Sequence, residues 1–157
     1  MFLRKLALLF VFILFCNAPA HALADPGMRD LCVLSFPEEK ILWQEKLPDG
    51  ENDFSLFFIH SVSKTEVEDQ YRVNGPHIIQ TAELFIAHGA GLPSLKDEVG
   101  EQSWTLENGQ FVLKMDRPID KLVLRVNPDY RNRLVFDGTD LDITQWGRRA
   151  LLIRLCE

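Results

Sequence analysis

Apolar and polar residues alternate over short runs along most of the chain, and turn residues separate these runs. Val67, Tyr71 and Val73 share one parity within residues 66–73, and the other parity is that of Glu66, Glu68, Gln70 and Arg72. This period of two is typical of a half-buried strand. Residues 53–61 carry large apolar side chains at both parities, which indicates a strand covered on both faces.

The pattern predicts about nine short strands joined by tight turns. Asn74-Gly75 and Asn108-Gly109 are strong hairpin signals. A short helical turn is expected within residues 140–146, and an exposed loop at residues 95–103. The predicted fold class is all-β and mainly antiparallel, either a β-sandwich or a partly open barrel. The strand-like runs are residues 31–36, 40–47, 53–61, 66–73, 77–88, 104–107, 110–115, 121–127, 133–136 and 150–156.

Residues 1–24 have the three parts of a signal peptide, namely a basic pair, an apolar core at residues 6–15 and small residues after it. We expect cleavage after Ala24, or alternatively after Ala22. Residues 25–157 would then form one β-rich domain in the periplasm or outside the cell. A retained membrane anchor is disfavoured because the apolar run is shorter than the ~20 residues that span a bilayer.

The chain of 157 residues has a formal net charge of −6. Nucleic acids and anionic membranes attract proteins with clustered positive charge. We therefore expect neither nucleic acid as a partner nor membrane insertion after signal cleavage. A small carboxylate held by one or two arginines remains compatible with this charge.

Two cysteines, Cys32 and Cys156, lie near the ends of the expected domain, each within an apolar run. An even pair of cysteines in an exported protein is typical of a disulfide. We expect these two to bond and so to join the first strand to the last. Two buried free thiols are the alternative.

The chemistry is densest in residues 57–75, FFIHSVSKTEVEDQYRVNG. His60 and Ser61 are adjacent, so a strand points their side chains to opposite faces, which disfavours a base and nucleophile pair. Further along the stretch, one strand face is shared by Glu66, Glu68 and Arg72 instead. The candidate binding residues in this stretch are His60, Ser61, Lys64, Thr65, Glu68 and Arg72.

A catalytic function is one alternative for the same stretch. A metal-dependent or acid–base enzyme would use His60 with Glu66 or Glu68. The sequence has no compact zinc motif and no nucleophile elbow. We therefore assign no catalytic residue, no metal ligand and no cofactor.

The charged side chains can also satisfy one another. Arg125 interrupts an apolar run, and Glu83 is expected on the strand face of Ile79 and Phe85. An internal ion pair is therefore an alternative to ligand binding, and it would suit a structural envelope protein without a ligand. The pairs considered are Arg72 or Arg125 with Glu68 or Glu83.

The motif HSVSKTEVEDQYRV at residues 60–73, followed by the turn GAGLP, resembles the bacterial family catalogued as domain of unknown function 1850. The resemblance covers essentially the whole expected domain and adds Gly89, Gly91 and Pro93 to the candidate binding residues. It implies a small exported protein encoded beside tripartite ATP-independent periplasmic (TRAP) transporters of the TAXI type. Those transporters combine a periplasmic solute-binding protein with a membrane permease.

This resemblance implies a periplasmic, non-enzymatic accessory protein of such a transporter. The stretch from His60 to Arg72 and the turn from Gly89 to Pro93 would form one surface. That surface would bind a partner, either the TRAP permease or the solute-binding protein, or else a small anionic solute.

Overall fold

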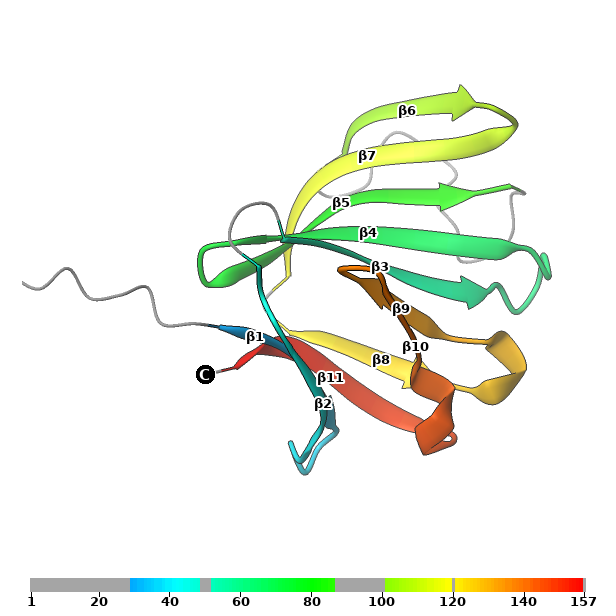
Figure 1. Ribbon diagram of the computed structural model, residues 1–157. Coiled ribbons are helices and arrows are strands. Elements are labelled where there is room, and N and C mark those ends of the chain that lie inside the picture. The colour runs from blue at the N-terminus through cyan, green and yellow to red at the C-terminus, as the bar shows by residue number, and fades with distance from the viewer. Residues whose placement is uncertain (1–28, 49–51, 87–100, 120, 157) are drawn as a thin grey trace, which may run out of the picture.

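Two antiparallel β-sheets face one another in the computed structural model and form a sandwich (Figure 1). The all-β prediction is confirmed, with eleven strands among the described residues rather than about nine, and the sheets remain separate instead of closing into a barrel. The expected signal peptide lies outside the described part of the chain. The structure describes residues 29–48, 52–86, 101–119 and 121–156.

The larger sheet has seven strands in the order β10-β9-β3-β4-β5-β7-β6. Consecutive hairpins build its centre, so the predicted chemistry-rich stretch supplies two neighbouring central strands, β3 and β4. The bounds are β3 (Asn52–Ile59), β4 (Glu66–Asn74), β5 (His77–Phe85), β6 (Glu101–Glu107), β7 (Gln110–Ile119), β9 (Arg133–Phe136) and β10 (Thr139–Asp142).

The smaller sheet has the order β2-β1-β11-β8. The first and last strands of the chain are neighbours in it, and a disulfide between Cys32 and Cys156 joins them, as predicted. In the described residues, no helix is long or apolar enough to cross a membrane. The bounds are β1 (Asp30–Ser35), β2 (Ile41–Lys46), β8 (Leu122–Val126) and β11 (Arg149–Cys156), with 3₁₀ turns η1 (Pro128–Tyr130) and η2 (Ile143–Trp146).

Two segments differ from the prediction. In the expected helical turn at residues 140–146, the first three residues belong to strand β10 instead. Asp137 and Gly138 both have positive φ and fold β10 back onto β9 in a tight hairpin. The helical part is confined to η2. The second difference lies in the expected loop at residues 95–103, whose last residues, 101–103, belong to β6 and pair with β7. In both segments, hydrogen bonding to the neighbouring strand determines the secondary structure.

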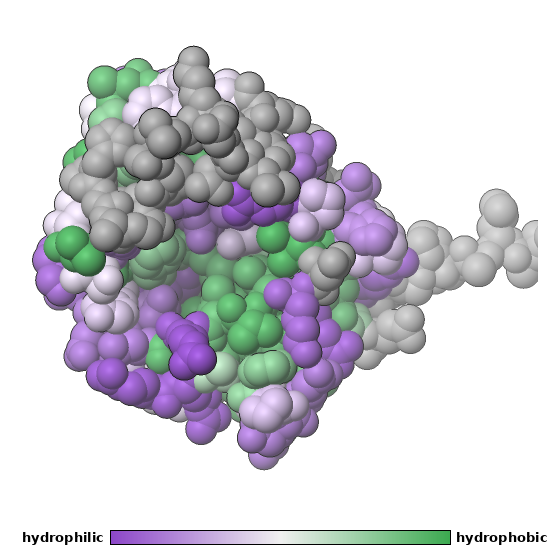
Figure 2. Space-filling model, turned by 180° about the vertical axis from the view of Figure 1, so that it is seen from behind, coloured by the Kyte–Doolittle hydropathy of each residue, from purple (hydrophilic) through white to green (hydrophobic). Residues whose placement is uncertain are grey.

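The main core fills the space between the two sheets. Buried apolar side chains of β1 and β11 pack there against those of β3, β4 and β9. Figure 2 shows hydrophobic side chains at the floor of a hollow on the rear face, framed by hydrophilic ones. The largest fully buried members of this core are Leu31, Leu134, Phe136, Ile143, Leu151 and Ile153.

A β-bulge in β5 changes which side chains face the core. Tyr71 pairs with Gln80 and Gln70 pairs with Ala82, so Thr81 is an extra residue in β5. An extra residue reverses the alternation of side chains beyond it. The prediction that Glu83 and Ile79 share a face is therefore wrong.

Candidate functional site

The turn between β3 and β4 is closed by hydrogen bonds around His60. The side chain of His60 is only 8% exposed, and its Nδ1 accepts a hydrogen bond of 3.2 Å from the Ser63 amide. The Ser63 hydroxyl lies 3.1 Å from Nδ1 and 2.9 Å from the Thr65 hydroxyl. Nδ1 is therefore the hydrogen-bond acceptor of this ring toward the backbone. His60 and Thr65 thus shape the turn.

Lys64 occupies the tip of this turn in the left-handed conformation, with φ of 58°. Its amide donates to the His60 carbonyl at 3.0 Å, and its Nζ lies 6.0 Å from the centroid of the Tyr130 ring. That distance is the outer limit of a cation–π contact. The turn therefore reaches η1, while Ser61 is exposed beside it.

The outer face of the larger sheet, the face turned away from the smaller sheet, carries the polar side chains of β4. The strand register places Glu66, Glu68, Gln70 and Arg72 together there, as predicted. Ser55 of β3 donates to the Glu68 carboxylate at 2.8 Å, and Gln70 donates to the same oxygen at 2.9 Å. Glu68 is thus held by its neighbours on the sheet.

Arg72 pairs with Asp53, which corrects the expected pairing with Glu68 or Glu83. Its Nε and second terminal nitrogen donate to the two carboxylate oxygens of Asp53 at 2.8 and 3.0 Å. Asp53 lies directly opposite Arg72 on β3, whereas four residues along one strand span roughly 13 Å. Glu83 faces the interior beside Asp69, on the other side of the sheet.

We predict a small energetic coupling between Arg72 and Asp53. Their side chains are 47% and 52% exposed, and exposed ion pairs contribute about 0.5 kcal/mol even with good geometry. A double-mutant cycle with Arg72→Ala and Asp53→Ala, followed by urea unfolding, measures this coupling. A coupling above about 2 kcal/mol would show that the pair is a structural element of the fold.

Arg133 extends the polar row across the sheet. Its two terminal nitrogens bind Glu66 of β4 at 3.3 Å and Asp140 of β10 at 2.7 Å. The guanidinium also lies 4.7 Å from the centroid of the Phe57 ring. Hydrogen bonds therefore connect strands from β10 to β4 across the outer face.

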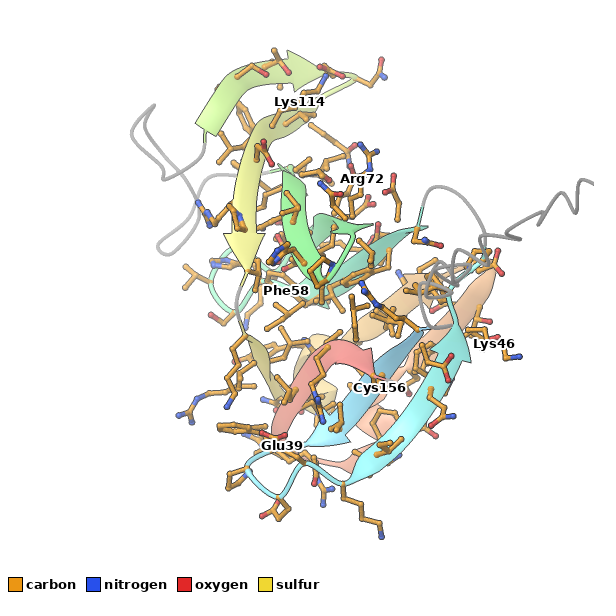
Figure 3. The ribbon with its side chains drawn as sticks, turned by 90° about the vertical axis from the view of Figure 1, so that its left-hand side faces the viewer. Glu39, Lys46, Phe58, Arg72, Lys114 and Cys156 are labelled. Carbon is orange, nitrogen blue, oxygen red and sulfur yellow. A yellow bond between two sulfur atoms is a disulfide. The ribbon has the colours of Figure 1, made fainter. Side chains whose placement is uncertain are left out.

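A shallow groove of about 250 Å³ lies on this outer face. Figure 3 shows Arg72 on the larger sheet, well apart from Cys156 of the smaller sheet and from Glu39 in the turn between β1 and β2. The groove brings together hydroxyl, amide and carboxylate groups from β3, β4, β5 and the β9–β10 turn. Its polar lining is Asp53, Ser55, Gln70, Thr81 and Asp137.

The structure divides the predicted site residues into two groups. His60, Ser61, Lys64 and Thr65 form the turn, whereas Glu68 and Arg72 belong to the outer face, and Arg72 lies roughly 20 Å along the strand from the turn. The remaining candidates are outside the described residues. These are Gly89, Gly91 and Pro93.

The geometry does not join His60 to the acidic residues considered for catalysis. The His60 ring bonds to its own turn, Glu66 to Arg133, and Glu68 to Ser55 and Gln70. Within the described ranges, no group of three or more metal-binding side chains gathers.

Sequence analysis missed a polar cluster on the inner face of the larger sheet. Tyr71 donates to the Asp69 carboxylate at 3.4 Å, and Gln80 donates to its other oxygen at 3.3 Å. Arg117 of β7 in turn donates to the Gln80 side chain at 3.4 Å. The sequence did contain a signal for this cluster, because Asp69 has the same parity as the apolar residues Val67 and Tyr71 and is therefore expected on the inner face.

Burial raises the pKa of Asp69 from 3.8 to about 6, although the Tyr71 hydroxyl, the Arg117 charge and Gln80 oppose this shift. Burial likewise raises the pKa of Tyr71, and the negative charges of Asp69 and Glu83 add to this effect. The Tyr71 ring stacks on Phe54 with a centroid distance of 4.9 Å. The phenol therefore stays protonated and acts as a hydrogen-bond donor to Asp69.

The family comparison covers the part of the chain that holds this surface. Residues 54–143 match the family model described as Domain of unknown function (DUF1850). The matched range contains most of β3, all of β4 to β10, and every candidate binding residue. No curated protein and no solved structure matches the chain.

Proposed function

The chain belongs to the family of the domain of unknown function 1850, and from this premise we propose that it is an exported, non-enzymatic accessory protein of a TAXI-type TRAP transporter. It acts by docking a partner protein on the outer face of the larger sheet. The observation that carries the proposal is the row of exposed and half-buried polar side chains on that face, which hydrogen bonds already hold in place.

Pre-positioned side chains favour binding because they lose little conformational freedom when a partner arrives. Ser55, Glu68 and Gln70 form one such hydrogen-bonded set, and Arg133 forms another with Glu66 and Asp140. The face is polar, which suits a reversible interface better than a permanent one.

Charge supports the choice of a partner with a basic or donor-rich patch. The chain has a formal net charge of −6, and two carboxylates line the groove, namely Asp53, which pairs with Arg72, and Asp137. Complementary charge increases the rate of association and orients the partner. The proposed partner is the permease or the solute-binding protein of the neighbouring transporter.

A Gln→Arg pair of variants tests this interface. Gln70→Arg places a long cation in the groove, opposite the proposed basic patch of the partner. Because like charges repel, we expect the affinity for the partner to fall at least about tenfold. Gln44→Arg is the matched control, because Gln44 is an exposed residue of β2 in the other sheet. Co-purification from a strain that carries the transporter, followed by titration with the isolated partner, measures the difference.

The proposal predicts that wild type and Gln44→Arg retain the partner while Gln70→Arg loses it. Retention of the partner by both variants would place the interface elsewhere. Absence of association with the wild-type protein, together with unchanged solute uptake in a deletion strain, would reject the accessory function itself.

A further inference from the structure

Strand β8 forms one edge of the smaller sheet. Among the strands that the structure describes, it pairs with β11 alone (Figure 1). An edge strand presents a row of main-chain donors and acceptors on which a further strand can pair. We propose that β8 binds an extended acidic segment of a partner protein by β-strand addition. The proposal rests on this edge and does not depend on docking at the outer face of the larger sheet.

The side chains of β8 divide between two faces of the smaller sheet. Leu122 and Val126 are buried in the main core, and Leu124 packs against it half-buried. Val123 and Arg125 have the other parity and point to the solvent side of this sheet, where Val123 is 38% exposed. A strand added beside β8 places its own side chains on the same two faces.

The surroundings of β8 are basic, although the whole chain has a formal net charge of −6. The segments that contain β8 and β11, residues 121–132 and 143–156, together carry six lysines and arginines and one acidic residue. Lys121 directly precedes β8, and its side chain is 52% exposed at 4.0 Å from Glu39. In the part of the chain that the structure describes, no carboxylate forms an ion pair with Arg125. This local excess of positive charge favours an acidic partner.

Strand parity defines the kind of sequence that the partner offers. Acidic side chains of the added strand lie beside Lys121 and Arg125 on the solvent side. The side chains between them lie on the core side, where apolar groups cover the exposed part of Leu124. Opposite charges and apolar pairs across neighbouring strands are both stabilising. The predicted ligand therefore alternates acidic and apolar residues over at least the five-residue length of β8.

The other edge strands of the two sheets suit an acidic segment less well. Each of them carries at least one carboxylate, whereas β8 carries none, and like charges on paired strands are destabilising. A second copy of this chain is disfavoured as the occupant, because pairing β8 with β8 brings two basic strands together. The edge-strand carboxylates are Glu45 of β2, Glu107 of β6, and Asp140 and Asp142 of β10.

Titration of the purified protein with labelled peptides of about eight residues, followed by fluorescence anisotropy, tests the proposal. One peptide alternates Glu and Val, and its control contains the same residues in two separate blocks. We expect the alternating peptide to bind at least about tenfold more tightly. Only every second amide of an added strand faces β8. N-methylation of alternate residues should therefore abolish binding in one of its two phases and leave it nearly unchanged in the other.

A pair of Arg→Glu variants tests the basic side of the edge. Arg125→Glu replaces attraction with repulsion beside the bound strand, so we expect the affinity for the alternating peptide to fall at least about tenfold. Arg131→Glu is the matched control, because Arg131 is also exposed but lies beyond η1, outside the strand. Binding to this control should stay within about twofold of wild type.

Equal weakening by the two variants would indicate general electrostatic attraction and overturn the proposal. The proposal also fails if the alternating and block peptides bind equally, if neither phase of N-methylation weakens binding, or if no peptide binds at millimolar concentration. A wild-type dimer in light scattering that Arg125→Glu alone changes would assign the edge to a second copy instead. Circular dichroism and thermal unfolding establish that the compared variants are folded.

Discussion

Replacing both Cys32 and Cys156 with alanine is expected to lower the free energy of unfolding by about 4 kcal/mol. The bond joins residues separated by 124 positions in the sequence, so it closes a loop that contains nearly all of the described structure. In the chain-entropy account, a cross-link stabilises by restricting the unfolded chain, and the effect increases with loop length.

Reductant provides the control for this prediction. Urea unfolding of wild type with dithiothreitol should approach the midpoint of the double alanine variant, and the variant itself should not respond to dithiothreitol. Cys32 is 0% exposed, so its replacement adds a packing cost to the loss of the bond. Comparing Cys32→Ala with Cys156→Ala, which both lack the bond, reveals this packing cost. A double variant as stable as the oxidised wild type would contradict the prediction.

Replacing Asp69 with asparagine is expected to remove a pH-dependent loss of stability. The pKa of Asp69 is raised in the folded protein to about 6 from 3.8, so the folded state binds this proton more tightly than the unfolded state does. Stability from this group is therefore fully present below about pH 4 and is lost as pH rises to about 6. Above about pH 6, the free energy of unfolding of the wild type, compared with that of Asp69→Asn, should therefore be about 3 kcal/mol lower than it is below about pH 4.

The measurement is urea unfolding of wild type, Asp69→Asn and Asp69→Ala between pH 4 and pH 7. Both variants lack the carboxylate, so the difference in stability between each variant and wild type should change over the same pH range. Asp69→Ala should be the less stable of the two, because it loses the contacts with Tyr71 and Gln80. A pH-independent difference would contradict the raised pKa.

Most of the fold follows from the sequence because strand parity and turn residues are local signals. The alternation in residues 66–73 gave the correct outer and inner faces of β4. The bulge at Thr81 was not visible, because it arises from the register between two strands and not from the pattern within one. The same limit concealed the pairing of Arg72 with Asp53, which are 19 positions apart.

The candidate site was only partly accessible to sequence reasoning. The predicted stretch does contain the outer-face residues Glu68 and Arg72, and it lies within the range that matches the family model. Arg125 was noticed in the sequence because a charge in an apolar run is a local signal, but its pairing with Ala150 depends on strand register and was not visible.

The docking of a partner on the outer face is the central claim, and site-specific photo-crosslinking in cells tests it most directly. A crosslinkable amino acid at Gln70, in the groove of the larger sheet, should capture the TRAP permease or solute-binding protein. The same amino acid at Gln44, on the smaller sheet, should capture neither. Capture from Gln44 alone, or from neither position in cells that express the transporter, would contradict the account.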